Sequence, residues 1–237
     1  SALIIAFQVF TFPQAVIAQA IATAMFPTFS SQAAIGDSRA LRDSLAASLR
    51  AALYLAIPAS VGLWLLGRPL ISMLFQNSTF SAQSTEMVAW ALRWYALGLV
   101  SHSVVEIVTR VYFAQKDTRT PVTIGLMAML INVTLSIILT AAFQSYRLLP
   151  HGALALANTI ATTLEMIVLL WLLRPRLGWM VDKSMLLSVA RTSAGVIAMA
   201  LVLRVWIALE PASVLALSLI GVVLGGTTFW VVTALLG

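Results

Sequence analysis

The chain has 237 residues, of which 61% are hydrophobic and only 9% are charged, and its formal net charge is +6. Soluble domains carry about a quarter charged residues, so a mean hydropathy of +0.99 excludes an ordinary soluble domain and indicates an integral membrane protein. The cations are those that membrane topology and anionic lipids require, so we expect no nucleic-acid partner.

Seven apolar stretches are long enough to cross a bilayer as helices. They lack the alternation of barrel strands, so we predict an all-α, polytopic transmembrane helical bundle. Residue 1 is Ser, and the first stretch begins without a basic flank, so we expect a fragment of a longer protein. The predicted spans are residues 2–30, 47–67, 84–113, 121–143, 150–173, 186–209 and 212–236.

The first span carries a polar stripe formed by Gln8, Thr11, Gln19 and Thr23. We expect Pro13 to interrupt the helix between them. Polar helices broken by Pro often line a transport path. Gln and Thr also serve as packing contacts between helices, so both interpretations stay open.

Turn signals separate the first spans. The Gly-Asp-Ser sequence at 36–38 predicts a helix stop followed by an N-cap. In residues 37–51, Arg and Leu alternate at helical spacing, which predicts an amphipathic helix along the membrane surface. The Gly-Arg-Pro sequence at 67–69 is expected to break the second span, and turns are expected at 77–78 and 210–211.

In the third span, His102, Glu106 and Arg110 are four residues apart and share a helical face. One interpretation is a self-satisfied ladder in which Glu106 bridges the other two. The other is that Glu106 or Arg110 faces a water-filled substrate cavity, because ionisable groups are costly in a membrane.

The loop after the third span, YFAQKDTRTPV at 112–122, gathers Lys116, Asp117 and Arg119, followed by Thr120 and Pro121. It predicts a tight turn with Pro121 in the first turn of the next helix. The loops after the first, third and fifth spans hold most of the cations. The positive-inside rule therefore predicts that these loops are cytoplasmic, that the N-terminus lies outside and that the C-terminus lies inside.

In the fifth span, Asn158, Thr162 and Glu165 form another polar stripe. Interhelical hydrogen bonds would explain Asn158 and Thr162, whereas Glu165 lies well inside an apolar run and is expected to face a cavity. The sequence has no hydrolase, zinc-protease or P-loop motif and no cysteine. We therefore expect a transporter rather than an enzyme, with no metal site and no cofactor.

Four blocks resemble the MurJ/MviN family of lipid II flippases, within the multidrug/oligosaccharidyl-lipid/polysaccharide exporter superfamily. They occur in the order and spacing of that family and cover roughly residues 3–180. The resemblance implies fourteen spans in two six-helix lobes and a C-terminal pair. Residues 1–180 would be a partial second lobe, and residues 181–237 the C-terminal pair. The blocks are FPQAVIAQAIATAMFPTFSSQAAIGD (12–37), IPASVGLWLLGRPLISMLFQNSTFSAQST (57–85), ALRWYALGLVSHSVVEIVTRVYFAQKDTRTPV (91–122) and HGALALANTIATTLEMIVLLWLLRPRLG (151–178).

The resemblance also implies a function in peptidoglycan synthesis and cell shape at the bacterial inner membrane. Such proteins move the undecaprenyl-pyrophosphate-linked peptidoglycan precursor to the outer leaflet, as two lobes rock about a central cavity. Their last two spans form an apolar groove for the lipid tail. The implied partners are this precursor, membrane lipids and an N-terminal lobe of the same chain.

The sequence departs from the family at three positions. Alignment on Pro13 puts Gln8 where relatives often have Arg and Thr11 at an acidic position, and Glu106 stands where some relatives have Lys. We expect the first lobe to supply most of the phosphate-binding Arg, with Arg110 contributing from this half. The alternatives are a drug or ion antiporter, another polysaccharide-lipid flippase, or an inactive membrane scaffold homologue.

Overall fold

The computed structural model describes residues 2–75, 81–146, 149–178, 183–209 and 213–236. These residues contain seven helical segments long and apolar enough to cross a membrane, which confirms the predicted all-α bundle. The turns expected at 77–78 and 210–211 lie outside the described residues. The elements are α1 (Ala2–Gln14), the π-helix η1 (Ala15–Gln19), α2 (Ala20–Ala34), α3 (Ser38–Phe75), α4 (Ala82–Ala114), α5 (Arg119–Ser145), α6 (Pro150–Leu177), α7 (Lys183–Ala208) and α8 (Val214–Leu235).

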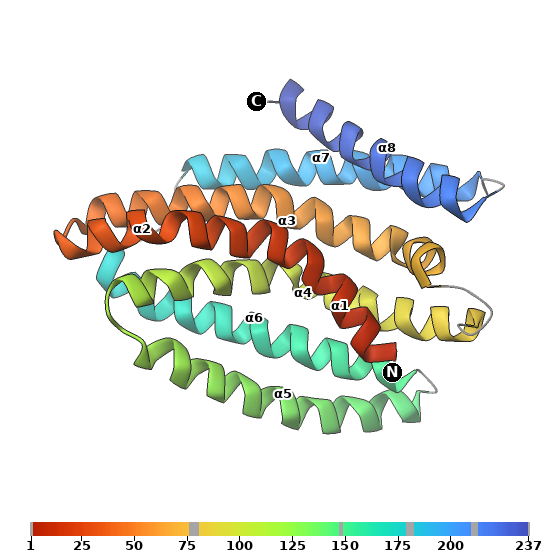
Figure 1. The fold of residues 1–237 in the computed structure, drawn as a ribbon, viewed down its shortest axis with the longest axis horizontal. Coiled ribbons are helices and arrows are strands. Elements are labelled where there is room, and N and C mark those ends of the chain that lie inside the picture. Colours follow the sequence, from red (N-terminus) through yellow and green to blue (C-terminus); the bar gives the residue numbers. More distant parts are fainter. Residues whose placement is uncertain (1, 76–80, 147–148, 179–182, 210–212, 237) are drawn as a thin grey trace.

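The first span continues through Pro13, contrary to the predicted interruption. Pro13 lies inside α1, and η1 joins α1 directly to α2. A proline removes one backbone donor, and a π-helical turn accommodates such a disturbance because it lengthens the hydrogen-bonded ring by one residue. Figure 1 shows that the helix axis bends where α1 and α2 meet.

The predicted stop and cap at 36–38 are confirmed. Gly36 has φ 74°, which suits a residue without a Cβ, and Asp37 Oδ1 accepts a hydrogen bond of 2.9 Å from the Ala40 backbone N–H. Helix α3 then begins at Ser38.

The predicted surface helix at 37–51 and the predicted break at 67–69 are wrong. Both stretches belong to the 38-residue helix α3, which contains Pro58 and Pro69. Leu41, Leu45 and Leu49 are buried in a core cluster with residues of α2, α4 and α6, so protein rather than lipid covers this apolar face. A proline can kink a helix without ending it, and Figure 1 shows the gold end of α3 turning out of line.

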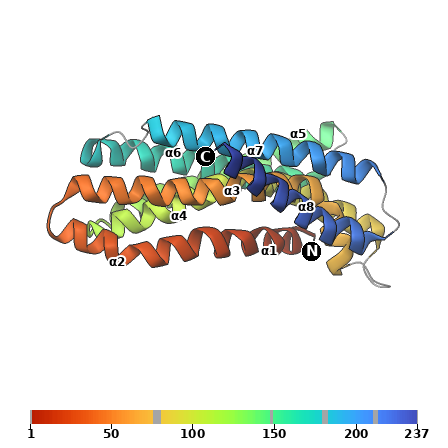
Figure 2. The ribbon, with the colours of Figure 1, turned by 90° about the horizontal axis from the view of Figure 1, so that it is seen from above.

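Helix α4 lies at the centre of the bundle and contacts α1, α2, α3 and α6. The buried share of its apolar segment is 56%, compared with 6% for α5, which packs mainly on α6. Helices α7 and α8 contact each other and α3, and among the described residues they form no substantial contact with another helix. Figures 1 and 2 show this pair as an outer layer along α3.

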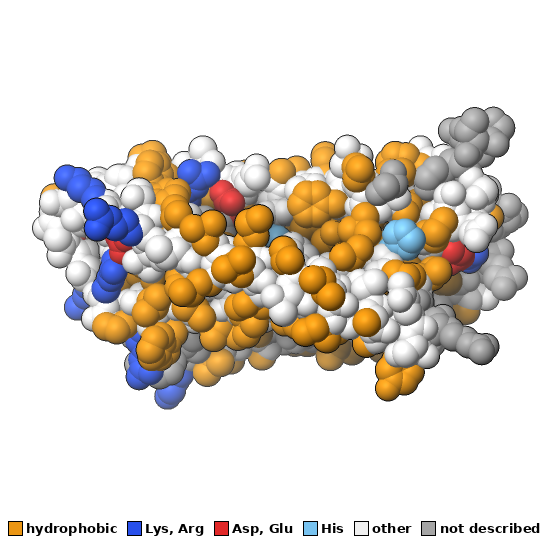
Figure 3. All heavy atoms as spheres, turned by 90° about the horizontal axis from the view of Figure 1, so that it is seen from below, with side chains coloured by type: hydrophobic (Ala, Val, Ile, Leu, Met, Phe, Trp, Pro, Cys, Tyr) orange, Lys and Arg blue, Asp and Glu red, His pale blue; other side chains and the backbone are white. Residues whose placement is uncertain are grey.

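The turns after α2, α4 and α6 lie at the same end of the molecule (Figure 1). Lys and Arg side chains gather at this end, on the left of Figure 3. Among the described residues, the cations in and beside these turns include Arg39, Arg42, Lys116, Arg119, Arg174, Arg176 and Lys183. The charge asymmetry expected from the sequence is thus an asymmetry in space. The side of the membrane that this end occupies stays a prediction.

Candidate functional site

A polar layer joins α4 to α6 near the middle of the bundle. His102 Nε2 lies 3.0 Å from Asn158 Oδ1 and 3.3 Å from Thr162 Oγ1. Next to it, the hydroxyls of Ser101 and Thr163 lie 2.8 Å apart. Asn158 and Thr162 therefore make the interhelical hydrogen bonds that the sequence suggested. Such contacts stabilise helix pairs in lipid, where an unpaired polar group is costly.

Helix α1 closes over this layer. The ring of Phe10 is fully buried and meets the His102 ring edge to face, with centroids 5.1 Å apart. Phe10 also stacks on Tyr95 at 5.5 Å. His102 is therefore enclosed by three helices, and its imidazole positions α6 against α4.

Glu106 and Arg110 form an ion pair on α4, with Arg110 Nη2 3.1 Å from Glu106 Oε1. The predicted ladder is wrong at its first step, because His102 bonds to α6 instead of Glu106. The side chains of Glu106 and Arg110 are 26% and 35% exposed. The pair is thus partly exposed at the surface of this chain.

Glu165 faces a different neighbour from Asn158 and Thr162, so the predicted stripe is divided. Its Oε1 lies 3.5 Å from the position that a Cβ on Gly125 of α5 would take. The half-buried carboxylate makes no hydrogen bond or ion pair with any described residue. Glu165 therefore lies between α5 and α6, away from the His102 layer.

The polar residues of the first span lie largely on the outside of the chain. Gln8, Gln19 and Thr23 are exposed. Thr11 is half-buried, and its hydroxyl donates to the backbone carbonyls of Phe7 and Gln8 in its own helix. Three of the four side chains of the stripe are therefore not covered by the described residues of this chain.

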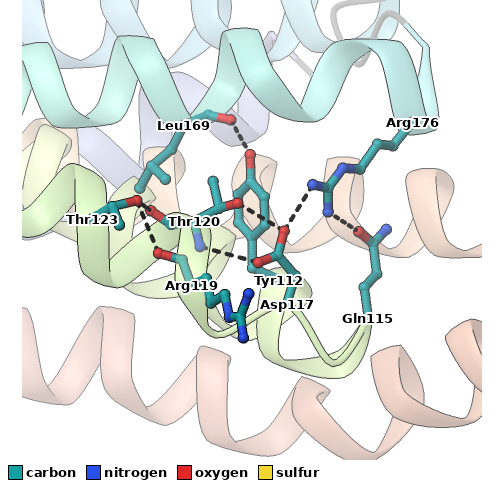
Figure 4. A network of polar contacts seen from close by, with 8 residues as sticks. All are labelled: Tyr112, Gln115, Asp117, Arg119, Thr120, Thr123, Leu169 and Arg176. Atoms are coloured by element: carbon teal, nitrogen blue, oxygen red, sulfur yellow. Dashed lines mark hydrogen bonds and ion pairs between the residues drawn. The ribbon is translucent and has the colours of Figure 1, made fainter.

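The loop at 112–122 forms the predicted tight turn, and Asp117 organises it (Figure 4). Lys116 adopts φ 60°. Asp117 accepts hydrogen bonds from the Thr120 backbone N–H at 3.0 Å and the Thr120 hydroxyl at 2.8 Å, which caps the start of α5. Pro121 lies in the first turn of that helix, as predicted.

Arg176, at the end of α6, binds this turn from the other side, a contact that the sequence did not predict. Its Nη2 lies 2.7 Å from Asp117 Oδ2, and its Nη1 donates to Gln115 Oε1 at 3.3 Å. The guanidinium also lies 5.3 Å from the ring centre of Tyr112, whose hydroxyl donates to the Leu169 carbonyl at 2.8 Å. The hydrogen bond from the Thr120 N–H, together with Arg176, lowers the pKa of Asp117.

These contacts give the loop residues a structural role, because they bind the α4–α5 turn to the end of α6. The sequence did indicate that the 112–122 loop and the end of the fifth span both carry charges and lie on the same side of the membrane. Nothing in the sequence spacing identified which Arg would pair with Asp117.

An apolar groove of about 480 Å³ is lined by residues of α1, α3, α7 and α8. Its walls carry almost no polar surface and include Phe12, Pro58, Leu63, Met199, Gly221 and Phe229. Among the described residues, no three His, Asp or Glu side chains are grouped closely enough to hold a metal ion. The chain therefore combines a partly exposed ion pair on α4 with an apolar groove beside its last two helices.

A family model described as lipid II flippase MurJ matches residues 1–226. A protein named probable lipid II flippase MurJ from Vibrio cholerae serotype O1 is 30% identical over 158 residues, covering 67% of this chain and 29% of that protein. A protein of the same name from Rhizobium meliloti is 29% identical over 231 residues, covering 94% of this chain and 42% of that protein.

A solved structure described as lipid II flippase MurJ, inward closed conformation, is similar with a TM-score of 0.81 and 23% identity. The match covers 99% of this chain and 46% of that chain. The chain thus has the fold of part of that structure, and it spans less than half the length of these relatives.

Proposed function

The chain belongs to the lipid II flippase MurJ family, and on this premise we propose that the intact protein moves lipid II from the cytoplasmic to the outer leaflet by alternating access. The family and the seven apolar helices make the chain part of a multi-pass inner-membrane protein. The observation that carries the proposal is the extent of the match, because the family model covers residues 1–226. This extent favours lipid II transport over the antiporter and scaffold alternatives.

We propose that residues 1–180 form part of the second lobe and residues 181–237 a C-terminal pair of helices. The packing supports this division, since the described parts of α7 and α8 contact α3 and each other. The first lobe would then complete the central cavity against the helices whose polar side chains this chain leaves uncovered.

We assign the pyrophosphate contact in this half to Arg110. Its guanidinium is partly exposed and its charge is balanced by Glu106, so an incoming anion would exchange one carboxylate partner for another oxyanion. Gln8, Gln19 and Thr23 offer neutral polar surface on α1 and α2. The apolar groove fits the polyprenyl tail, which needs no polar partner.

We assign no substrate contact to five other polar residues of the spans, namely His102, Asn158, Thr162, Glu165 and Thr11. His102, Asn158 and Thr162 hold α6 against α4, and Thr11 bonds to its own helix. Glu165 has no described partner and lies beside α5, so its carboxylate would respond to movement of that helix.

The test is rescue of cells depleted of their own lipid II flippase by the intact protein. We expect the unaltered protein to restore growth and peptidoglycan synthesis. Arg110→Gln should reduce the rate of lipid II appearance in the outer leaflet at least about tenfold, as expected when a charge-assisted contact is lost.

Arg204→Gln is the matched control, because Arg204 is exposed on α7 and has no place in the proposed cavity. It should behave as the unaltered protein does. Normal membrane expression without rescue, combined with drug efflux driven by protons or sodium, would refute lipid II transport and support an antiporter.

A further inference from the structure

A second cavity, of about 310 Å³, lies between α3, α7 and α8, at the end of the molecule where the cations gather. Its volume is at the lower end of the range for small-molecule sites. Its lining is mostly hydroxyl-bearing, unlike the apolar groove. The lining residues are Tyr54, Ser184, Leu187, Ser188, Arg191, Thr192 and Thr233.

The back of this cavity is fixed by hydrogen bonds. The Thr233 hydroxyl donates to the Phe229 carbonyl at 2.9 Å, so the Tyr54 hydroxyl, 2.8 Å away, acts as the donor to Thr233. Thr192 is buried, and its hydroxyl donates to the Ser188 carbonyl at 2.8 Å. These three residues form a rigid polar wall between three helices.

The front of the cavity presents donors that have no partner. Neither the Arg191 guanidinium nor the Ser188 hydroxyl forms a hydrogen bond or ion pair with any described residue. At the edge, the Arg50 guanidinium donates to the Ser184 hydroxyl. None of the described residues that line the cavity is acidic, so the guanidinium groups of Arg191 and Arg50 make the described part of the site positive.

The position of Arg191 along α7 indicates that its charge has an anionic partner. It lies eight residues after the first residue of α7, which is about 12 Å along the helix axis. Cations within a spanning helix are costly and almost always pair with an anion or face water. A fork-shaped guanidinium beside a hydroxyl matches the tetrahedral oxygens of a phosphate group.

We propose that this cavity binds the phosphate group of an anionic membrane lipid. Arg191 and Ser188 bind the phosphate oxygens, with Arg50 at the rim. The exposed side chain of Leu187 lines the site and contacts the acyl chains. The lipid joins α7 and α8 to α3, and this site is separate from the proposed transport cavity.

The test uses the intact purified protein and counts bound lipid by native mass spectrometry. The probe is phosphatidylglycerol, digalactosyldiacylglycerol is the phosphate-free control, and inorganic phosphate is the soluble competitor. Arg191→Gln should weaken the affinity of the site for phosphatidylglycerol about tenfold. At a limiting lipid concentration, the variant should therefore carry one bound phosphatidylglycerol fewer than the unaltered protein. Ser188→Ala should weaken it less, and Arg204→Gln on the same helix should leave it unchanged.

Thermal unfolding in the phosphate-free lipid verifies that each variant is folded. Inorganic phosphate that binds through Arg191 in place of the lipid would support the phosphate site and identify a soluble source. Equal lipid binding by Arg191→Gln and Arg204→Gln would overturn the proposal, as would equal binding of phosphatidylglycerol and the phosphate-free lipid. If Arg191→Gln does not fold, unchanged lipid binding by Ser188→Ala overturns it.

Discussion

Asp117 connects the α4–α5 turn, the start of α5 and the end of α6 through one carboxylate. We predict that Asp117→Asn lowers the free energy of unfolding by about 1 kcal/mol at neutral pH, because the charge paired with Arg176 is lost, whereas the Asn side chain can still cap α5. The midpoint of thermal unfolding of the intact protein measures this change. Asp43→Asn is the control, because Asp43 pairs with its neighbour Arg42 and is 60% exposed. It should change stability by less than about 0.5 kcal/mol.

The same carboxylate predicts a pH dependence. The Thr120 N–H and Arg176 hold the pKa of Asp117 below its ordinary value of 3.8. A pKa that is lower in the folded state gives stability that is complete above the unfolded value and is lost as the pH falls through the folded value. The stability difference between the unaltered protein and Asp117→Asn should be constant from about pH 5 to 7 and shrink below pH 3.8. A difference that grows on acidification would contradict this account.

At the scale of helices, Gly152 permits the close crossing of α4 and α6. A Cβ at this position would lie 2.3 Å from Trp90 Nε1 and 2.7 Å from Trp94 Nε1. We predict that Gly152→Ala destabilises the intact protein by about 1–3 kcal/mol, the usual cost of overpacking. Gly62→Ala should be neutral or stabilising, because no atom lies within 4 Å of its added Cβ and Ala favours helix. Similar unfolding midpoints for both variants would contradict tight packing at this crossing.

The sequence predicted the number and type of helices correctly because apolar stretches of bilayer length leave few other structures for the backbone. The sequence-based predictions were wrong at positions where a helix was expected to end but continues. Pro13 and the 67–69 sequence were expected to end helices, yet packing and a π-helical turn preserve both spans. The surface helix at 37–51 was mistaken for a similar reason, since an amphipathic pattern does not reveal whether lipid or protein covers the apolar side.

Polar contacts within one helix of the candidate site could be predicted from the sequence, whereas contacts between helices could not. Glu106 and Arg110 are one helical turn apart, and their ion pair follows from spacing alone. His102 and Asn158 are far apart in sequence, and helix rotation decides that they meet. A small rotation also separates Glu165 from the stripe, because residues three or four apart share a face only approximately. Arg176 was missed because its partner depends on how α6 ends beside the α4–α5 turn.

At the scale of the whole molecule, charge varies along the length of the bundle, whereas burial varies across it. The cations separate one end of the bundle from the other, whereas burial separates the central helix α4 from the outer helix α5 and the α7–α8 pair. The proposed pyrophosphate contact lies on α4, whereas the proposed lipid-phosphate site lies on α3, α7 and α8, so Arg110→Gln and Arg191→Gln should each leave the other site intact.

The membrane orientation gives the last prediction. At the end opposite the cation-rich turns, Arg68 pairs with Glu86, so the positive-inside rule places the cation-rich end in the cytoplasm. Because this chain contains no cysteine, Gln83→Cys and Thr118→Cys mark the two ends of α4, both at exposed positions. In the intact protein, with any other cysteines replaced, a membrane-impermeant maleimide should label Gln83→Cys in intact spheroplasts. It should label Thr118→Cys only after permeabilisation. The opposite pattern would reverse the orientation and place the Asp117 turn outside, where anionic cytoplasmic lipids could not favour its cations.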